Sequence, residues 1–411
     1  KRNEILESMT DNVGQLVLRD NYLQTLVLRT AGYRARYTLP NHQIFMNKLE
    51  KSGELDRKIE FLPSDEVINE RMQENKGLTS PEMSVLLAYS KMSLDREILK
   101  SSLVTDPDFN DLLISYFPTH LQENYKEYIL THYLRKEIIA NQLANLVVNR
   151  AGMTFISRFS DEFSAPLPEI IKSWWIAYNL LDAQRLYAQV ETLDNKIDAE
   201  IQLRLYVGIE KAVERLCRWI LRYVKDLTSA SAIISKYKGH VTALEKHMGQ
   251  LIKSEEYPDV HEEESLYLAN NVPTELATVI SRQGYLPQVM DIVWLALEHN
   301  LDYDLVARNY FIAGRLLQVD WMRKNVLLLS RGNKWQALAR SALLADIFKL
   351  YRSTMLSAIN TTNGDTLAWM EVNQDKINKV KAILEELQSY KVLDLAMLSA
   401  AIREFGHILV D

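Results

Sequence analysis

The chain has 411 residues, of which 47% are hydrophobic and 25% are charged, with a formal net charge of -6 at pH 7. This acidic balance argues against a dedicated nucleic-acid-binding domain, which needs a basic face to neutralise phosphates. No apolar run approaches the ~20 residues that span a bilayer, so we expect no membrane segment. The single cysteine, Cys217, excludes a disulfide framework within the chain and fits a reducing, cytoplasmic setting. Because the chain starts at Lys1 without a methionine, we expect a piece of a longer polypeptide.

The first helical pattern, MTDNVGQLVLRDNYLQTLVL, carries a carboxylate on its apolar stripe. That stripe consists of Met9, Val13, Leu16, Leu23 and Val27, with Asp20 at its centre. In one interpretation the helix breaks near Arg19, and Asp20 or Asn21 caps a second helix, which is worth ~1 kcal/mol. In the other, the helix continues, and Asp20 enters an apolar interface where it needs a cationic partner. We prefer capping, or a partner within this chain, to an interdomain contact.

Two further helices are predicted from residues that typically begin or end a helix. Thr79 or Ser80 caps a helix with Pro81 in its first turn. The stretch from Thr119 to Gly152 is interpreted as one very long helix, with Thr119 as its cap and Gly152 as its stop.

The middle of the chain continues the helical pattern. One helix is predicted to start near Pro168, and another begins after Asp198 as its cap. Gly208 lies inside the second pattern at a cost of ~1 kcal/mol relative to alanine, so a close helix crossing is expected there.

The last third looks helical with short loops. The acidic stretch 254–265 is predicted to be an exposed connector. The clearest later breaks are the stretches SRGNK (330–334) and NTTNGD (360–365). No strand pattern is evident, so the sequence predicts an all-α, multi-helix fold with several long helices.

Two or three packed helical subdomains are expected. We assign residues 1–75 to a helical segment that follows, and packs on, a preceding domain. Residues 76–226 form a subdomain of long helices, and residues 227–411 form a C-terminal helical subdomain.

A polar face recurs on the predicted long helix. It consists of Asn141, Gln142, Asn145 and Asn149. The simpler interpretation is a partly exposed face, or amides bonded to a neighbouring helix end. The functional interpretation is a polar groove for a ligand. We prefer the simpler one, because amides alone offer no acid, base or charge.

Catalytic motifs are missing. Neither G-x-G-x-x-G nor a phosphate-binding P-loop occurs in the sequence. His240 and His247 are seven residues apart, and a metal site there needs further ligands, so surface histidines are preferred. Cys217 lies in an apolar helical pattern and is expected to be a buried, inert thiol.

Five blocks of sequence in one order carry a family resemblance. They are RNEILESMTDNVGQLVLRDNYLQT, LEKSGELDRKIEFLPSDE, GLTSPEMSVLLAYSK, LRKEIIANQLANLVVNRAG, and finally NYFIAGRLLQVDW with WQALARSALLAD. Together they resemble the C-terminal region of the large NAD-specific glutamate dehydrogenases of bacteria. The resemblance runs from Arg2 to about Asp346, and the segment 225–260 and the end of the chain match less well.

The resemblance implies a parent enzyme that oxidises L-glutamate to 2-oxoglutarate and ammonium with NAD. It places the catalytic residues and the dinucleotide fold before Lys1, so no catalytic, cofactor or metal site is expected here. It also implies the N-terminal catalytic domain of the same polypeptide as a partner, and a homo-oligomer.

Three roles stay open for this chain. It is a structural and assembly region, a regulatory ligand-binding domain, or a helical scaffold unrelated to dehydrogenation. Assembly predicts broad apolar surface patches, whereas regulation predicts a pocket with converging charges.

Overall fold

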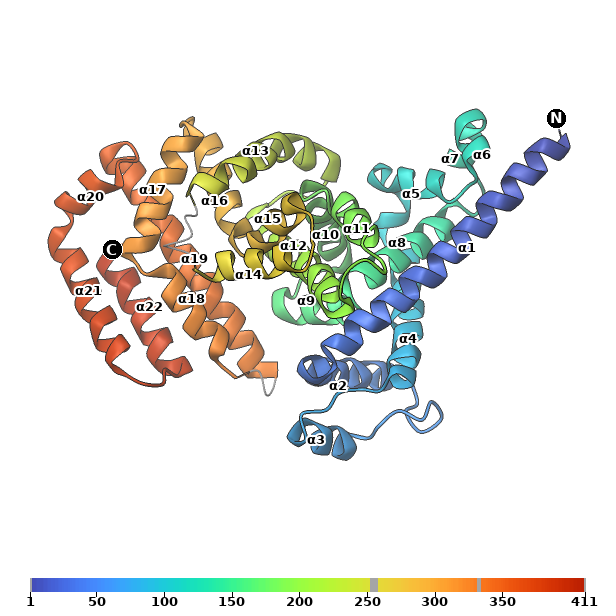
Figure 1. Ribbon diagram of the computed structural model, residues 1–411, viewed down its shortest axis with the longest axis horizontal. Coiled ribbons are helices and arrows are strands. Elements are labelled where there is room, and N and C mark those ends of the chain that lie inside the picture. The colour runs from blue at the N-terminus through green and yellow to red at the C-terminus, as the bar shows by residue number, and fades with distance from the viewer. Residues whose placement is uncertain (1, 252–257, 331–333, 410–411) are drawn as a thin grey trace. The chain divides into compact units, whose positions relative to one another are not determined.

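A computed structural model describes residues 2–251, 258–330 and 334–409, and every regular element in these ranges is a helix (Figure 1). The all-α prediction is therefore confirmed. The chain divides into two compact units, the first formed by residues 1–238 and 259–284, the second by residues 239–258 and 285–411. The subdomain boundaries near residues 75 and 226 stay predictions.

The first unit contains most of the chain's helices. They are α1 (Arg2–Tyr33), α2 (Ala35–Lys51), α3 (Asp65–Gln73), α4 (Ser80–Leu99), α5 (Asn110–Ser115), α6 (Thr119–Asn124), α7 (Lys126–Leu130), α8 (Arg135–Ala151), α9 (Phe155–Phe163), α10 (Leu167–Leu180), α11 (Ala183–Glu191), α12 (Ala199–Tyr223), α14 (Pro258–Ala269) and α15 (Thr274–Ser281), with short 3-10 turns η1 (Ser102–Thr105), η2 (Pro107–Phe109) and η3 (Gln283–Tyr285). The division between the units falls within α13 (Ala230–Leu251).

Several predicted helix ends are confirmed. Thr79 precedes α4 in a capping box, and its backbone N–H donates to Oε2 of Glu82 at 2.7 Å. The side chain of Asp198 accepts from the first backbone N–H groups of α12. Gly152 ends α8 with a φ of 84°, which a residue with a side chain adopts only at a cost.

The single long helix predicted from Thr119 to Gly152 is wrong. The chain instead forms α6, α7 and α8, with breaks at Tyr125 and at residues 131–134. Thr, His, Tyr and Asn cluster at these breaks, and their intrinsic helix propensity is low. The short helices fold back so that α7 packs against α5, and this tertiary packing outweighs a continuous helix.

The acidic connector predicted at 254–265 is also corrected. Residues 258–265 open α14, where Pro258 and the acidic Asp259 suit the first turn of a helix. Residues 254–257 lie outside the described residues, as do residues 331–333 of the predicted break at 330–334. The predicted break at 360–365 is confirmed, because α19 ends at Thr362 and the next helix starts at Thr366.

The core of the first unit forms around α12. This helix packs against α10, α11 and α15. The close crossing expected at Gly208 is confirmed, since a Cβ there would lie 2.8 Å from Cγ2 of Ile280 on α15. Cys217 is fully buried, and burial raises the pKa of its thiol, as expected for an inert residue.

The second unit is a smaller bundle. Its helices beyond α13 are α16 (Leu286–His299), α17 (Tyr303–Leu316), α18 (Val319–Leu328), α19 (Lys334–Thr362), α20 (Thr366–Val372), α21 (Gln374–Ser389) and α22 (Leu395–Leu409). The long helix α19 packs against α17, α18, α20 and α22 (Figure 1). In this core, the fully buried Asp291 pairs with Arg352 and accepts a hydrogen bond from the hydroxyl of Tyr310 at 2.8 Å.

Candidate functional site

Charged side chains gather around a cavity where α1 meets α8, α11 and α12 in the first unit. Helix α1 is far in sequence from the other three helices, and it contacts both α8 and α12 (Figure 1). Because each residue belongs to a packed helix, the arrangement is fixed by the fold rather than by a loop.

Glu191 connects α1 to α8. Its carboxylate accepts two hydrogen bonds from Arg19, with Nη1–Oε2 at 2.6 Å and Nη2–Oε1 at 2.9 Å. It also accepts from Nη2 of Arg150 at 3.2 Å. The Arg150 side chain is buried, and its guanidinium lies 4.1 Å from the ring centre of Tyr187. One carboxylate therefore neutralises two arginines, one of them inside the protein.

A second contact between α1 and the rest of the unit uses tyrosine hydroxyls. The hydroxyl of Tyr22 donates to Oδ1 of Asp194 and lies within hydrogen-bond distance of the Tyr206 hydroxyl, both at 3.2 Å. Burial, together with the neighbouring acidic groups, raises the pKa of Tyr22 to about 12. Tyr22 therefore stays neutral at physiological pH.

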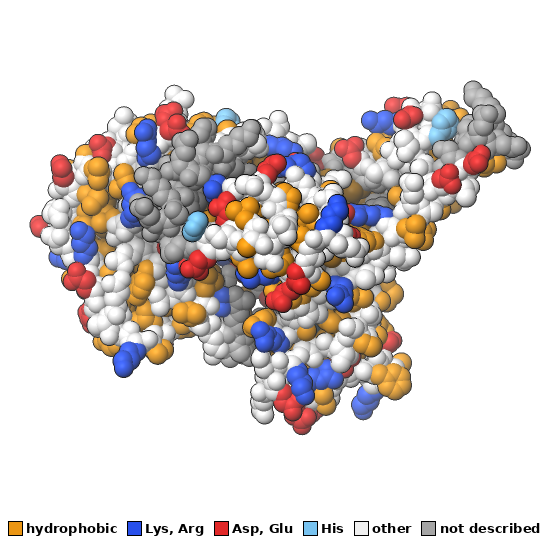
Figure 2. All heavy atoms as spheres, viewed as in Figure 1, with side chains coloured by type: hydrophobic (Ala, Val, Ile, Leu, Met, Phe, Trp, Pro, Cys, Tyr) orange, Lys and Arg blue, Asp and Glu red, His pale blue; other side chains and the backbone are white. Residues whose placement is uncertain are grey.

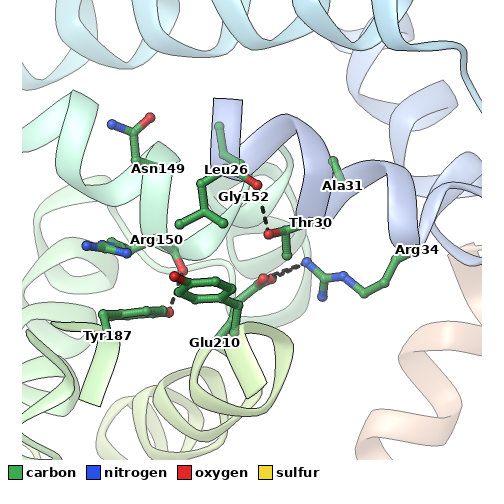
Figure 3. Close-up of a pocket in the computed structure, with 11 residues that line it drawn as sticks. Leu26, Thr30, Ala31, Arg34, Asn149, Arg150, Gly152, Tyr187 and Glu210 are labelled. Carbon is green, nitrogen blue, oxygen red and sulfur yellow. Dashed lines mark hydrogen bonds and ion pairs between the residues drawn. The ribbon is translucent and has the colours of Figure 1, made fainter. Parts of the chain in front are cut away.

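A small cavity lies beside these contacts (Figure 3). Its volume is about 30 Å³. The lining residues are Leu26, Val27, Thr30, Ala31, Arg34, Asn149, Arg150, Gly152, Tyr187, Tyr206 and Glu210. A volume of this size holds about two water molecules.

The polar groups around the cavity are only partly satisfied by the described residues. Nη2 of Arg34 pairs with both carboxylate oxygens of Glu210, at 2.7 and 2.5 Å (Figure 3). Among the described residues, no partner is found for Nε of Arg34, for Oδ1 of Asn149, or for Nε and Nη1 of Arg150. Burial raises the pKa of Glu210, whereas the charge of Arg34 acts in the opposite direction. The cavity is suited to bind water or a very small polar species.

The capping interpretation of Asp20 and Asn21 is wrong. Helix α1 runs unbroken from Arg2 to Tyr33, so neither residue stands at a helix end. Both are exposed, so Asp20 does not enter an apolar interface within the described chain. Arg19, beside them, is the residue of the three that makes the interhelix contact, through Glu191.

Asp20 nevertheless influences a cation of this chain. Lys91 on α4 has a buried ammonium with no hydrogen-bond partner among the described residues. Burial lowers the pKa of Lys91 to about 8, and the negative charge of Asp20 acts in the opposite direction. The carboxylate on the stripe of α1 thus partly offsets a charge buried beneath that helix.

The predicted polar face of α8 is split by the structure. Asn141 is exposed and accepts a hydrogen bond from Nδ2 of Asn145 at 3.1 Å. Gln142, Asn145 and Asn149 are half-buried, and of the four only Asn149 lines the cavity. A ligand-binding role for this face stays a prediction.

Sequence reasoning did not identify Arg34, Arg150, Tyr187, Glu191 or Glu210. One signal was present: Glu210 is followed by Glu214 four residues later, within the apolar pattern of α12. Acidic residues on a core-facing stripe need buried partners, and the structure supplies arginines.

A metal site at His240 and His247 would need further ligands. In the described part of the chain, no group of three His, Cys, Asp or Glu side chains is placed to hold an ion. His240 lies 2.8 Å from the hydroxyl of Tyr303, measured from Nδ1. The side chain of His247 lies outside the described residues. In the same ranges, no helix combines the length and hydrophobicity that crossing a membrane requires.

Comparison with known proteins identifies one family and several relatives of one kind. Residues 75–407 match the family described as "Glutamate dehydrogenase, C-terminal". The chain is 31% identical to the NAD-specific glutamate dehydrogenase of Pseudomonas aeruginosa and 30% identical to that of Halomonas elongata, over 98% of its own length. In both cases it spans only 25% of the length of the relative. Because the family match covers most of the chain, this protein belongs to the glutamate dehydrogenase C-terminal family.

Proposed function

We propose that this chain is the non-catalytic C-terminal helical region of an NAD-dependent glutamate dehydrogenase. The complete polypeptide converts L-glutamate and NAD to 2-oxoglutarate, ammonium and NADH. The observation that carries the proposal is that a C-terminal family matches most of the chain, while the chain spans one quarter of its relatives. In this proposal, the NAD and glutamate sites lie in the other three quarters of the complete polypeptide.

A structural role fits the chemistry of the buried groups. The buried acids of α12 are engaged by arginines: Glu210 by Arg34, and Glu214 by Arg158 and Arg218. Burial opposes the ionisation of Glu214, but the two arginines outweigh it and lower its pKa to about 2. A carboxylate held this firmly in its charged form is suited to holding helices together and is a poor general base near neutral pH.

The alternative of a regulatory domain is less well supported. Its best candidate site is the cavity lined by Arg34, Arg150 and Glu210, which has charged groups but a volume of only about 30 Å³. Ligand pockets for metabolites are about ten times larger. A regulatory role at this cavity would therefore require it to open.

We further propose that the region packs against the catalytic part of its own polypeptide and that the complete enzyme is a cytoplasmic homo-oligomer. Exposed apolar side chains occur in both units, for example Leu18 and Val392, which suits a region with several protein contacts.

The test compares the full-length polypeptide with a version that stops just before Lys1. Glutamate-dependent NADH formation and the oligomeric state are measured for both. We expect the full-length protein to be active, and the truncated one to lose activity together with its assembly state. Full-length protein without glutamate-dependent NADH formation would contradict the proposed reaction. A truncated protein with unchanged turnover and assembly would contradict the structural role.

A further inference from the structure

The N-terminal half of α1 projects from the first unit (Figure 1). From residue 10 to residue 21 every residue is exposed except Asn12, which is half-buried. The exposed apolar side chains of this half are Leu6, Val13, Leu16, Val17 and Leu18, with exposed fractions between 41% and 70%. In the space-filling view, hydrophobic side chains reach the surface along α1 (Figure 2).

An aromatic group lies beside this half of α1. Helix α6 contacts α1, and α7 contacts α6 (Figure 1). In and after these short helices, Tyr125, Tyr128 and Tyr133 are 46%, 76% and 84% exposed. The rings of Tyr125 and Tyr128 lie 6.2 Å apart, so the tyrosines form part of a cluster. We call residues 6–21 and 116–134 together the arm.

The arm exposes side chains of the kinds that interface cores contain, namely aliphatic residues and tyrosines. Tyrosine is enriched in interface cores, because its ring supplies a large contact area at low entropic cost. Leaving Leu or Val exposed forfeits about 1.5–3 kcal/mol per side chain relative to burial. Most helical stability in proteins comes from packing of an amphipathic face, and most of residues 10–21 are exposed, so docking would also stabilise this half of α1.

We propose that the arm is the docking surface for the catalytic part of the same polypeptide, which rests on the function proposed above. Two observations select this occupant. Three quarters of each relative lie outside the match to this chain. The C-terminal family match begins at residue 75, so α1 belongs to the aligned part of the relatives that precedes this family region.

Covalent linkage favours this occupant over a separate partner. A domain on the same chain meets the arm at a high effective concentration, so a surface of modest size suffices for permanent contact. Arg19 of the arm pairs with Glu191 of α11, so the arm is connected to the first unit near its C-terminal end.

The test is photo-crosslinking within the full-length polypeptide. A benzophenone amino acid replaces Leu18 or Tyr128 of the arm, or Val392 of the second unit as a control of similar exposure. Each protein is prepared with normal and with heavy isotopes, mixed, irradiated and analysed by peptide mass spectrometry. We expect Leu18 and Tyr128 to link to peptides that precede Lys1, with both peptides from the same isotopic copy, and Val392 to give no such link.

Three outcomes would overturn the proposal. Links that join a normal to a heavy copy would make the arm an interface between subunits. Links confined to residues 1–411 would mean that the arm folds back on its own region. An arm with no more links to the preceding polypeptide than Val392 would mean that no docking occurs.

Glutamate-dependent NADH formation is measured on the same preparations. Its absence, with the expected links present, would reject the proposed reaction and leave the docking surface standing. Activity without the links would reject the docking surface and leave the reaction standing.

Discussion

Arg19 on α1 and Glu191 at the end of α11 form a two-point ion pair across 172 positions of sequence. The same carboxylate receives a hydrogen bond from the buried Arg150. The two arginines differ in exposure, since 43% of the Arg19 side chain is exposed but only 6% of that of Arg150. Glu191 should therefore contribute more to the free energy of unfolding through Arg150 than through its partly exposed pair with Arg19.

The first prediction follows from this asymmetry. Arg19→Ala should destabilise the 411-residue chain by at most about 1 kcal/mol, because partly exposed pairs contribute little. Glu191→Ala should cost about 3 kcal/mol, because it leaves the guanidinium of Arg150 buried without a carboxylate. Urea unfolding followed by circular dichroism measures both values. Equal losses for the two variants would mean that Arg150 gains nothing from Glu191.

The second prediction concerns pH and the buried His42 on α2. Burial, with the nearby positive charges of Arg34 and Arg158, lowers the pKa of His42 to about 4 from its usual 6.5. Between these values the unfolded chain binds the proton more readily, so stability falls as the pH drops from about 6.5 to about 4. The full loss at acid pH is about 3 kcal/mol, since one pKa unit corresponds to about 1.4 kcal/mol.

Urea midpoints measured across this pH range check the effect. His42→Leu should remove much of the dependence on pH in that window, whatever it does to the stability at pH 7. His299, which is exposed on the second unit, provides the control as His299→Gln. If the two variants keep the same pH profile, His42 is not the group responsible.

Local chemistry made some of the fold predictable from sequence. A cap such as Asp198, a capping box at Thr79 and a stop at Gly152 act within one helical turn, so their residues are adjacent in sequence. The break between α6 and α8 combines low local helix propensity with the packing of α7 against α5, and no local pattern reports that packing. This explains why the end of the predicted long helix was right and its continuity was wrong.

The candidate site was less predictable for the same physical reason. Arg34, at the junction of α1 and α2, and Glu210 are separated by 176 positions, and the packing of α1 on α12 brings them together. Arg19 was identified for the wrong purpose, as part of a helix boundary around Asp20. The apolar stripe around Asp20 was interpreted as a buried face, but the structure exposes most of residues 10–21.

The third prediction uses the close approach of α12 to α15. Gly208→Ala introduces a methyl group 2.8 Å from Cγ2 of Ile280, which is buried and cannot move freely. Overpacking of about 1–3 kcal/mol opposes the gain of about 1 kcal/mol in helix propensity, so we expect a net loss of about 1 kcal/mol.

The matched control is Gly14→Ala in α1. A Cβ at Gly14 meets no atom within 4 Å, so only the propensity gain applies and stability should rise or stay unchanged. Thermal unfolding of the two variants gives the comparison. Stabilisation by Gly208→Ala would show that Ile280 yields at little cost.

The fourth prediction concerns the second unit, where Asp291 and Arg352 form a buried ion pair. Asp291→Ala should cost about 3–5 kcal/mol, because it leaves the guanidinium buried and removes the acceptor of the Tyr310 hydroxyl. Arg352→Met removes the cation and leaves a buried carboxylate without this ion pair, although the Tyr310 hydroxyl still donates to it. The double variant leaves neither charge buried without its partner. Its loss of stability should therefore be smaller than the sum of the single losses by about 2 kcal/mol.

Urea unfolding of the unmodified chain, the two single variants and the double variant measures this coupling. Strictly additive losses would mean that the two charges are compensated by other groups and not by each other.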